Sequence, residues 1–79
     1  MEIKFTLHAL ERIKERGITL EEVVQCLIYL DKIERDSGKT VFYKLNDKKT
    51  ELLILVCTID NVSCKIITAF RTSKIYKYL

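Results

Sequence analysis

The chain has no proline and only two glycines, Gly17 and Gly38, among its 79 residues. Because these two residue types mark loops and linkers, their scarcity argues against a flexible interdomain linker and a low-complexity segment. A chain this short buries one small core. We therefore expect residues 1–79 to form a single domain.

Cysteine and histidine are too few for a disulfide framework or a zinc site. The three cysteines form no C-x-x-C pair, and His8 is the only histidine. An odd set of cysteines without such a pair is typical of reduced thiols, so we expect them to be buried in a cytoplasmic protein. The sequence also has no Gly-rich phosphate loop, paired-carboxylate constellation or Ser-centred elbow. We therefore expect no metal and no cofactor.

The chain also lacks a long hydrophobic run. Its longest apolar run, Leu52 to Cys57, is far too short to cross a bilayer, and no signal peptide is recognisable. We expect no membrane partner. The net charge of +3, from 14 basic and 11 acidic residues, is a mild excess that permits nucleic-acid binding without requiring it.

Two helical patterns occupy the first third of the sequence. Apolar residues recur every third position after Thr6, which is a suitable N-cap, and they predict a helix over residues 7–16. Thr19 and Glu22 then form a T-x-x-E capping box that begins a second amphipathic helix. We expect this helix to end at about Leu30.

After the second helix the apolar period changes to two, which is typical of strands. The expected strands are Ile33–Asp36, Thr40–Leu45, Leu52–Ile59 and Lys65–Phe70. This order predicts an α+β fold in which two N-terminal helices precede a curled antiparallel sheet of three to four strands. The residues expected to supply the core are Leu10, Ile13, Val23, Leu27, Leu53, Leu55, Ile66 and Ile67.

A candidate site lies on the first predicted helix, where His8, Arg12 and Arg16 are spaced four apart and share one stripe. Arginine offers a fork of donors to phosphate, and a neutral imidazole can accept a proton near pH 7. The stripe therefore suits the binding and cleavage of a phosphodiester, with His8 and Arg12 as catalytic residues and Arg16 as a phosphate contact. The alternative is a solvated charged face with a capping histidine.

The C-terminal tail combines cations with aromatic residues. Phosphate charge and base stacking bind single-stranded nucleic acid, so this composition predicts an RNA contact. The alternative is a terminus whose tyrosines cover the sheet. The residues assigned to nucleic-acid binding in the tail are Arg71, Lys74, Tyr76 and Lys77.

The segment from His8 to Thr19 resembles the opening of a small family known as a domain of unknown function, H-A-x-x-R-x-x-x-R-G-I followed by Ser or Thr. The closing strand, Lys65–Phe70, is similar both to that family and to the BrnT-type toxins of toxin–antitoxin pairs. This resemblance implies a RelE-like toxin fold, and it places Thr68 and Arg71 where related toxins carry polar residues. In contrast to BrnT-like chains, the sequence ends eight residues after Arg71 rather than continuing into a charged helix.

The resemblance implies a toxin or toxin-derived domain that cleaves RNA without a metal, with or without the ribosome. An RNA, a ribosome or an antitoxin protein is then the expected partner, and a homo-oligomer is compatible with the sequence. The alternative is a non-catalytic module that uses the same surface to bind nucleic acid or a partner protein, and a third is an interaction domain without a nucleic-acid role.

Overall fold

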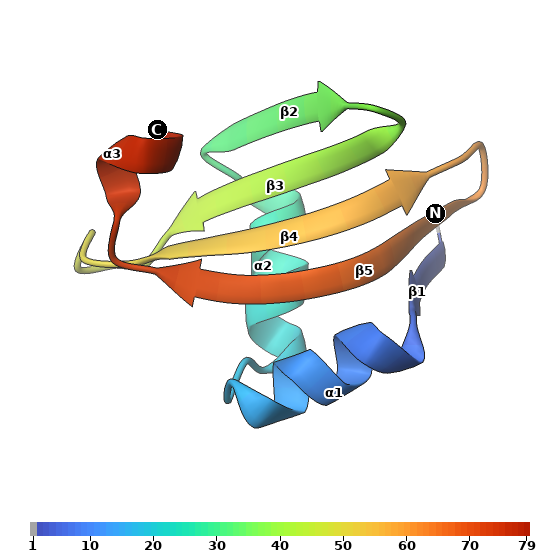
Figure 1. The fold of residues 1–79 in the computed structure, drawn as a ribbon, viewed down its shortest axis with the longest axis horizontal. Helices are drawn as coiled ribbons and strands as arrows, with labels where there is room; N and C mark the ends of the chain where they lie inside the picture. Colours follow the sequence, from blue (N-terminus) through green and yellow to red (C-terminus); the bar gives the residue numbers. More distant parts are fainter. Residues whose placement is uncertain (1) are drawn as a thin grey trace.

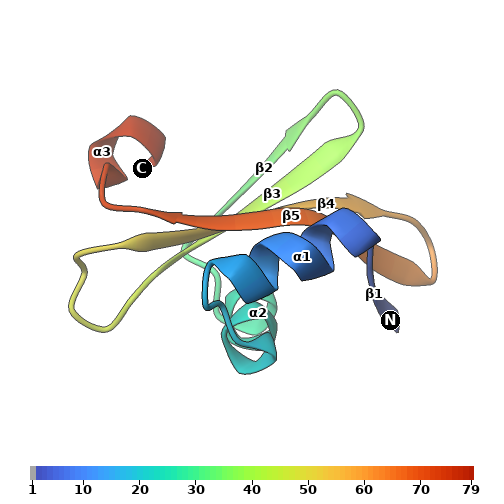
Figure 2. The same cartoon turned by 60° about the horizontal axis from the view of Figure 1, so that its bottom comes forward.

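Five strands form one mixed sheet, and two helices cover one of its faces (Figures 1 and 2). The computed structural model describes residues 2–79. The strands lie side by side in the order β1-β5-β4-β3-β2. Their bounds are β1 Glu2–Phe5, β2 Lys32–Asp36, β3 Lys39–Leu45, β4 Leu52–Ile59 and β5 Ser63–Thr72. The helices are α1 Leu7–Glu15, α2 Leu20–Ile28 and α3 Ile75–Tyr78.

Both long helices begin at threonine caps, as their sequences predict. The Thr6 hydroxyl accepts a hydrogen bond from the Ala9 N–H, at 3.0 Å, and so begins α1. Thr19 and Glu22 form the complete capping box of α2. Gly17 adopts a φ of +64° between the helices, a left-handed conformation that glycine reaches without a steric penalty. The chain therefore turns sharply from α1 into α2.

The strand β5 organises the sheet because it pairs on both sides. Its first four residues, Ser63–Ile66, pair in parallel with β1, and its residues from Cys64 to Thr72 pair antiparallel with β4. The register with β4 shifts near the middle of β5, where Ile66 opposes Cys57 and Thr68 opposes Val56. Ile67 is thus the extra residue of a β-bulge.

The bulge decides which side chains of β5 face the helices. Ile66 before it and Ala69 after it both join the core beneath α1 and α2, although they are an odd number of positions apart. Without the bulge, strict alternation would turn Ala69 and Arg71 away from the helices. Because of the bulge, Arg71 lies on the side of the sheet that α2 covers.

The sheet has an apolar cluster on each face. The helix-covered face holds the larger cluster, which includes Ala9, Val23 and Leu55. On the opposite face, α3 covers a smaller cluster of Tyr43, Leu52 and Ile54 at one end of the sheet (Figure 1). All three cysteines are buried and unpaired on the helix-covered side, as expected.

No helix within residues 2–79 reaches the length and apolar character that crossing a bilayer requires.

The expected arrangement of two helices followed by an antiparallel RelE-like sheet of three to four strands is wrong. A strand, β1, precedes the helices and pairs in parallel with β5, so the sheet is mixed and has five strands. β1 has only four residues and its partner lies at the other end of the chain, so local periodicity gives little sign of it. The tail adds a third helix, α3.

The other elements lie close to their expected positions, and most of the expected core is confirmed. β4 has the expected bounds, whereas α2 ends at Ile28, before the expected Leu30. Leu10 is a wrong core assignment, because its side chain is 44% exposed on the flank of α1. Leu27 and Ile67 are only partly buried. The expected core residues that are buried are Ile13, Val23, Leu53, Leu55 and Ile66.

We predict that Leu55→Ala lowers the free energy of unfolding by about 2 to 5 kcal/mol, because Leu55 is fully buried and its loss leaves a cavity. Urea denaturation measures this change. The matched control is Leu10→Ala, which should cost about 1 kcal/mol or less because the side chain is half exposed. Equal losses for the two variants would contradict this description of the core.

Candidate functional site

Arg71 of β5 forms hydrogen bonds with the helix corner, which is the segment from Arg16 to Glu22 where α1 ends and α2 begins. Its Nη2 donates to both carboxylate oxygens of Glu22, at 2.8 and 2.6 Å. Its guanidinium also donates to the main-chain oxygens of Arg16, at 3.0 Å, and Gly17, at 3.3 Å. One side chain therefore provides hydrogen-bond donors both to main-chain oxygens at the end of α1 and to a carboxylate at the start of α2.

Glu22 serves two purposes at this corner. Its Oε1 accepts from the Thr19 N–H at 3.1 Å within the capping box, while both its oxygens accept from Arg71. Partial burial raises the pKa of the Glu22 carboxyl, but the hydrogen bonds from Arg71 and Thr19 and the charge of Arg71 outweigh it, and the pKa falls below its ordinary value. Glu22 is thus held in its charged form.

Arg16 fastens α1 to the same strand. Its Nη1 donates to the Ala69 main-chain oxygen at 2.7 Å, and the Thr6 hydroxyl at the other end of α1 donates to the Ile67 oxygen at 3.3 Å. Both acceptors lie beyond Ile66, the last residue of β5 that pairs with β1. The two bonds therefore fix α1 along the part of β5 that β1 leaves free.

His8 is exposed on one flank of this fixed helix, and Arg12, one turn further on, is partly buried there. The His8 side chain is exposed in the first turn of α1, and no side chain among residues 2–79 forms a hydrogen bond with it. The Arg12 Nη1 lies 2.8 Å from Oε2 of Glu15, whose side chain is exposed. The three residues of the predicted stripe therefore have different surroundings. His8 has no side-chain partner in this part of the chain, Arg12 pairs with Glu15, and Arg16 bonds to β5.

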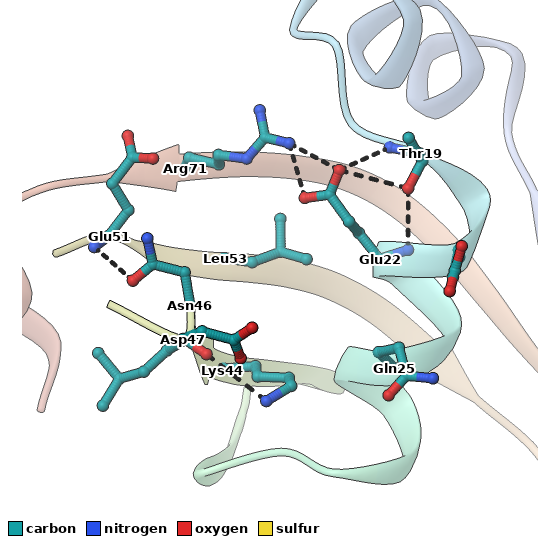
Figure 3. A pocket seen from close by; sticks show the side chains of 11 residues that line it. Thr19, Glu22, Gln25, Lys44, Asn46, Asp47, Glu51, Leu53 and Arg71 are labelled. Carbon is teal, nitrogen blue, oxygen red and sulfur yellow. Dashed lines mark hydrogen bonds and ion pairs between the residues drawn. The ribbon is translucent and has the colours of Figure 1, made fainter. Parts of the chain in front are cut away.

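A groove of about 400 Å³ opens beside the Arg71–Glu22 pair (Figure 3). It lies between the start of α2 and the β3–β4 hairpin, and Leu53 lies between Arg71 and Lys44 in Figure 3. Sequence reasoning missed this groove, because its parts come from three separate segments. The polar residues that line it are Thr19, Glu21, Glu22, Gln25, Lys44, Asn46, Asp47, Glu51 and Arg71.

The tail divides into a packed side and an exposed side. The Tyr78 ring packs against Tyr43, with 6.1 Å between ring centroids, and Lys32 Nζ donates to the Tyr78 main-chain oxygen at 2.6 Å. Burial and a hydrogen bond from the Tyr43 hydroxyl to Glu34 raise the pKa of Tyr43 to about 12. Tyr76 is 93% exposed. Part of the tail thus covers the sheet, and part faces solvent.

The structure divides the residues assigned to function into three places. His8 and Arg12 lie on α1 near β1, whereas α3 lies at the opposite end of the sheet (Figure 1). Lys74 and Lys77 are exposed there with Tyr76. Arg16 and Arg71 both bond to main-chain oxygens, and Arg71 also bonds to Glu22.

The chain belongs to the family described as Domain of unknown function (DUF4258), whose model matches residues 5–71. This range includes β5 up to Arg71 and ends before α3. No curated protein matches the chain. No solved structure matches it either.

We predict that Glu22→Gln makes stability less sensitive to acid. The folded-state pKa of Glu22 lies below its ordinary value of 4.5, so the pair stabilises the fold above that pH and its contribution is lost as the pH falls through the folded-state value. Glutamine can replace glutamate in a capping box, so the change removes mainly the ion pair. Urea denaturation at neutral and acidic pH measures the difference. The control is Glu21→Gln, one position away, which should retain the wild-type pH dependence.

We predict that the two tyrosines of α3 have different roles, with Tyr78 packing on the sheet and Tyr76 free to contact RNA. Tyr78→Ala should lower the melting temperature, because it removes packing against Tyr43 and Phe70, whereas Tyr76→Ala should leave it unchanged. If the exposed side of α3 contacts RNA, Tyr76→Ala should weaken binding of a single-stranded RNA to the folded protein. Thermal melts and fluorescence anisotropy test the two effects, and a lowered melt for Tyr76→Ala would contradict this division.

Proposed function

We propose that this domain binds and cleaves RNA without a metal, and that the flank of α1 carrying His8 and Arg12 is its reactive surface. The observation that carries the proposal is an exposed imidazole with no hydrogen-bond partner in residues 2–79, one turn before a guanidinium, on a helix fixed to the sheet at both ends. Fixed geometry is what catalysis by positioning requires.

Arg12 is the phosphate contact in this proposal. Its partner Glu15 is an exposed side chain three residues along the same helix, and exposed ion pairs contribute only about 0 to 1 kcal/mol. A phosphate can therefore take the place of Glu15 at small cost. Arg16 and Arg71 act mainly as positioning residues here, because their guanidiniums already hold α1 and α2 to β5.

His8 provides the proton chemistry. It accepts the proton of a ribose 2′-hydroxyl as that oxygen attacks the adjacent phosphorus, while the bond to the 5′-oxygen breaks and the leaving oxygen takes a proton from water. The products are a 2′,3′-cyclic phosphate and a 5′-hydroxyl. Arg12 stabilises the charge that develops on the phosphate oxygens.

The resemblance of Lys65–Phe70 to BrnT-type toxins supports a role as a toxin or toxin-derived domain, with an antitoxin protein as partner and with free or ribosome-bound RNA as substrate. The exposed Lys74, Tyr76 and Lys77 then form a second RNA contact on α3. Because α3 and His8 lie toward opposite ends of the sheet, only an extended RNA could reach both.

A non-catalytic binding module is the second candidate. Arg16 and Arg71 already bond to main-chain oxygens. Of the three arginines considered, only Arg12 is then available to act with His8 on a phosphate, and this small set of groups favours binding over catalysis. A module of this kind would bind RNA with the same salt dependence and cleave nothing.

We predict that His8→Ala lowers RNA cleavage by about 100-fold or more, because it removes the proton acceptor. The assay uses a fluorescent single-stranded RNA in EDTA and identifies the cyclic phosphate end by mass spectrometry. Arg12→Ala should weaken both RNA binding and turnover.

Lys14→Ala is the matched control, because it removes an exposed cation from another side of α1 and should leave cleavage unchanged. Cleavage that requires magnesium, or that persists without His8, would refute the mechanism. Binding without any cleavage by the wild type would replace it with the binding module.

A further inference from the structure

The strand β2 forms one edge of the sheet, and its outer side has no neighbouring strand. Four of its five residues are exposed. An open edge of this kind offers main-chain donors and acceptors to another strand. In Figure 2, the β2–β3 hairpin extends away from α1 and α2, so its outer edge is not covered by these helices.

The turn of this hairpin determines which groups point outward. Ser37 and Gly38 have φ values of +50° and +78° and join Asp36 to its partner Lys39 through a two-residue turn. In such a hairpin the pair beside the turn exchanges both hydrogen bonds, and the bonded pairs then alternate along the strands. The N–H and C=O groups of Ile33 and Arg35 therefore point away from β3.

We propose that β2 pairs antiparallel with β2 of a second copy of this chain, with Ile33 opposite Ile33 on a two-fold axis. Only registers that match the outward-facing groups of both copies form hydrogen bonds, and this register does so. The two Ile33 residues exchange two bonds at the centre. The Arg35 N–H of each copy then donates a hydrogen bond to the Asp31 main-chain oxygen of the other.

Charge favours this register over its neighbours. It places Lys32 of each copy opposite Glu34 of the other on one face of the sheet, and it places Arg35 opposite Asp31, which comes just before β2. A shift of the centre to Glu34 or Arg35 would place like charges directly opposite each other, which destabilises a strand pair. The edge is therefore self-complementary in charge as well as in hydrogen bonding.

Exposed apolar side chains accompany this edge. Ile33 is 45% exposed although it lies on the helix-covered side, next to its buried neighbour Phe42. Ile28 and Tyr29, which precede β2 in the chain, are also exposed. A second copy placed beside β2 covers Ile33 with its own Ile33. Because only one short strand from each copy takes part, we expect a weak, concentration-dependent dimer.

The test uses opposite charges at the two-fold axis. Ile33→Lys and Ile33→Glu each place like charges opposite each other in a homodimer, so each variant alone should dissociate about tenfold or more readily than the wild type. An equimolar mixture of the two variants places lysine opposite glutamate and should restore the dimer. Sedimentation velocity over a concentration series measures all three samples, and circular dichroism checks their folding.

Val62→Lys is the matched control, because Val62 is an aliphatic residue, 70% exposed, that lies in the β4–β5 turn and not on β2. It should dimerise like the wild type. A wild type that stays monomeric at every concentration, dimers that persist in both single variants, or a mixture that stays monomeric would each overturn the proposal. The experiment uses no RNA, so its outcome is independent of the proposed function.

Discussion

The position of the helices on the sheet depends on two guanidiniums that hold β5. Arg71 bonds to Glu22 and to the main chain at the end of α1, and Arg16 bonds to the Ala69 oxygen on the same strand. Partly buried charge-assisted bonds of this kind contribute more than exposed ion pairs do. They hold α1, α2 and β5 in one arrangement around a small core.

This arrangement gives each part of the opening motif a distinct purpose. The Thr6 cap and Arg16 fix the two ends of α1, Gly17 allows the turn, and Glu22 holds the start of α2. His8 and Arg12 lie between these fixed points, and within residues 2–79 neither side chain forms a hydrogen bond to the sheet. The motif therefore combines residues that hold α1 in place with two side chains, His8 and Arg12, on which the proposed reactive surface rests.

The sequence predicted the elements that local signals specify. The capping box at Thr19 and the apolar run from Leu52 placed α2 and β4 well. β1 was missed because parallel pairing with β5 joins the two ends of the chain and leaves no periodic pattern in four residues. The bulge at Ile67 was also missed, since it depends on the register with β4.

For the candidate site, only neighbours within one helix could be inferred from the sequence. Helical spacing alone placed His8, Arg12 and Arg16 on one stripe. It could not show that Arg16 reaches Ala69, or that Arg71 belongs with Glu22 rather than with the tail, because these contacts join residues about fifty positions apart. The groove beside them could not be predicted either, because its lining residues come from segments far apart in the sequence.

Arg71 and Glu22 act together to hold β5 to the segment that joins α1 and α2. A double-mutant cycle with Arg71→Met, Glu22→Gln and the double variant, followed by urea denaturation at neutral pH, measures this coupling. We expect a coupling free energy of about 1 to 3 kcal/mol, because either single change already removes the charge-assisted hydrogen bonds between the two side chains. Additive losses, with no coupling between the two positions, would contradict it.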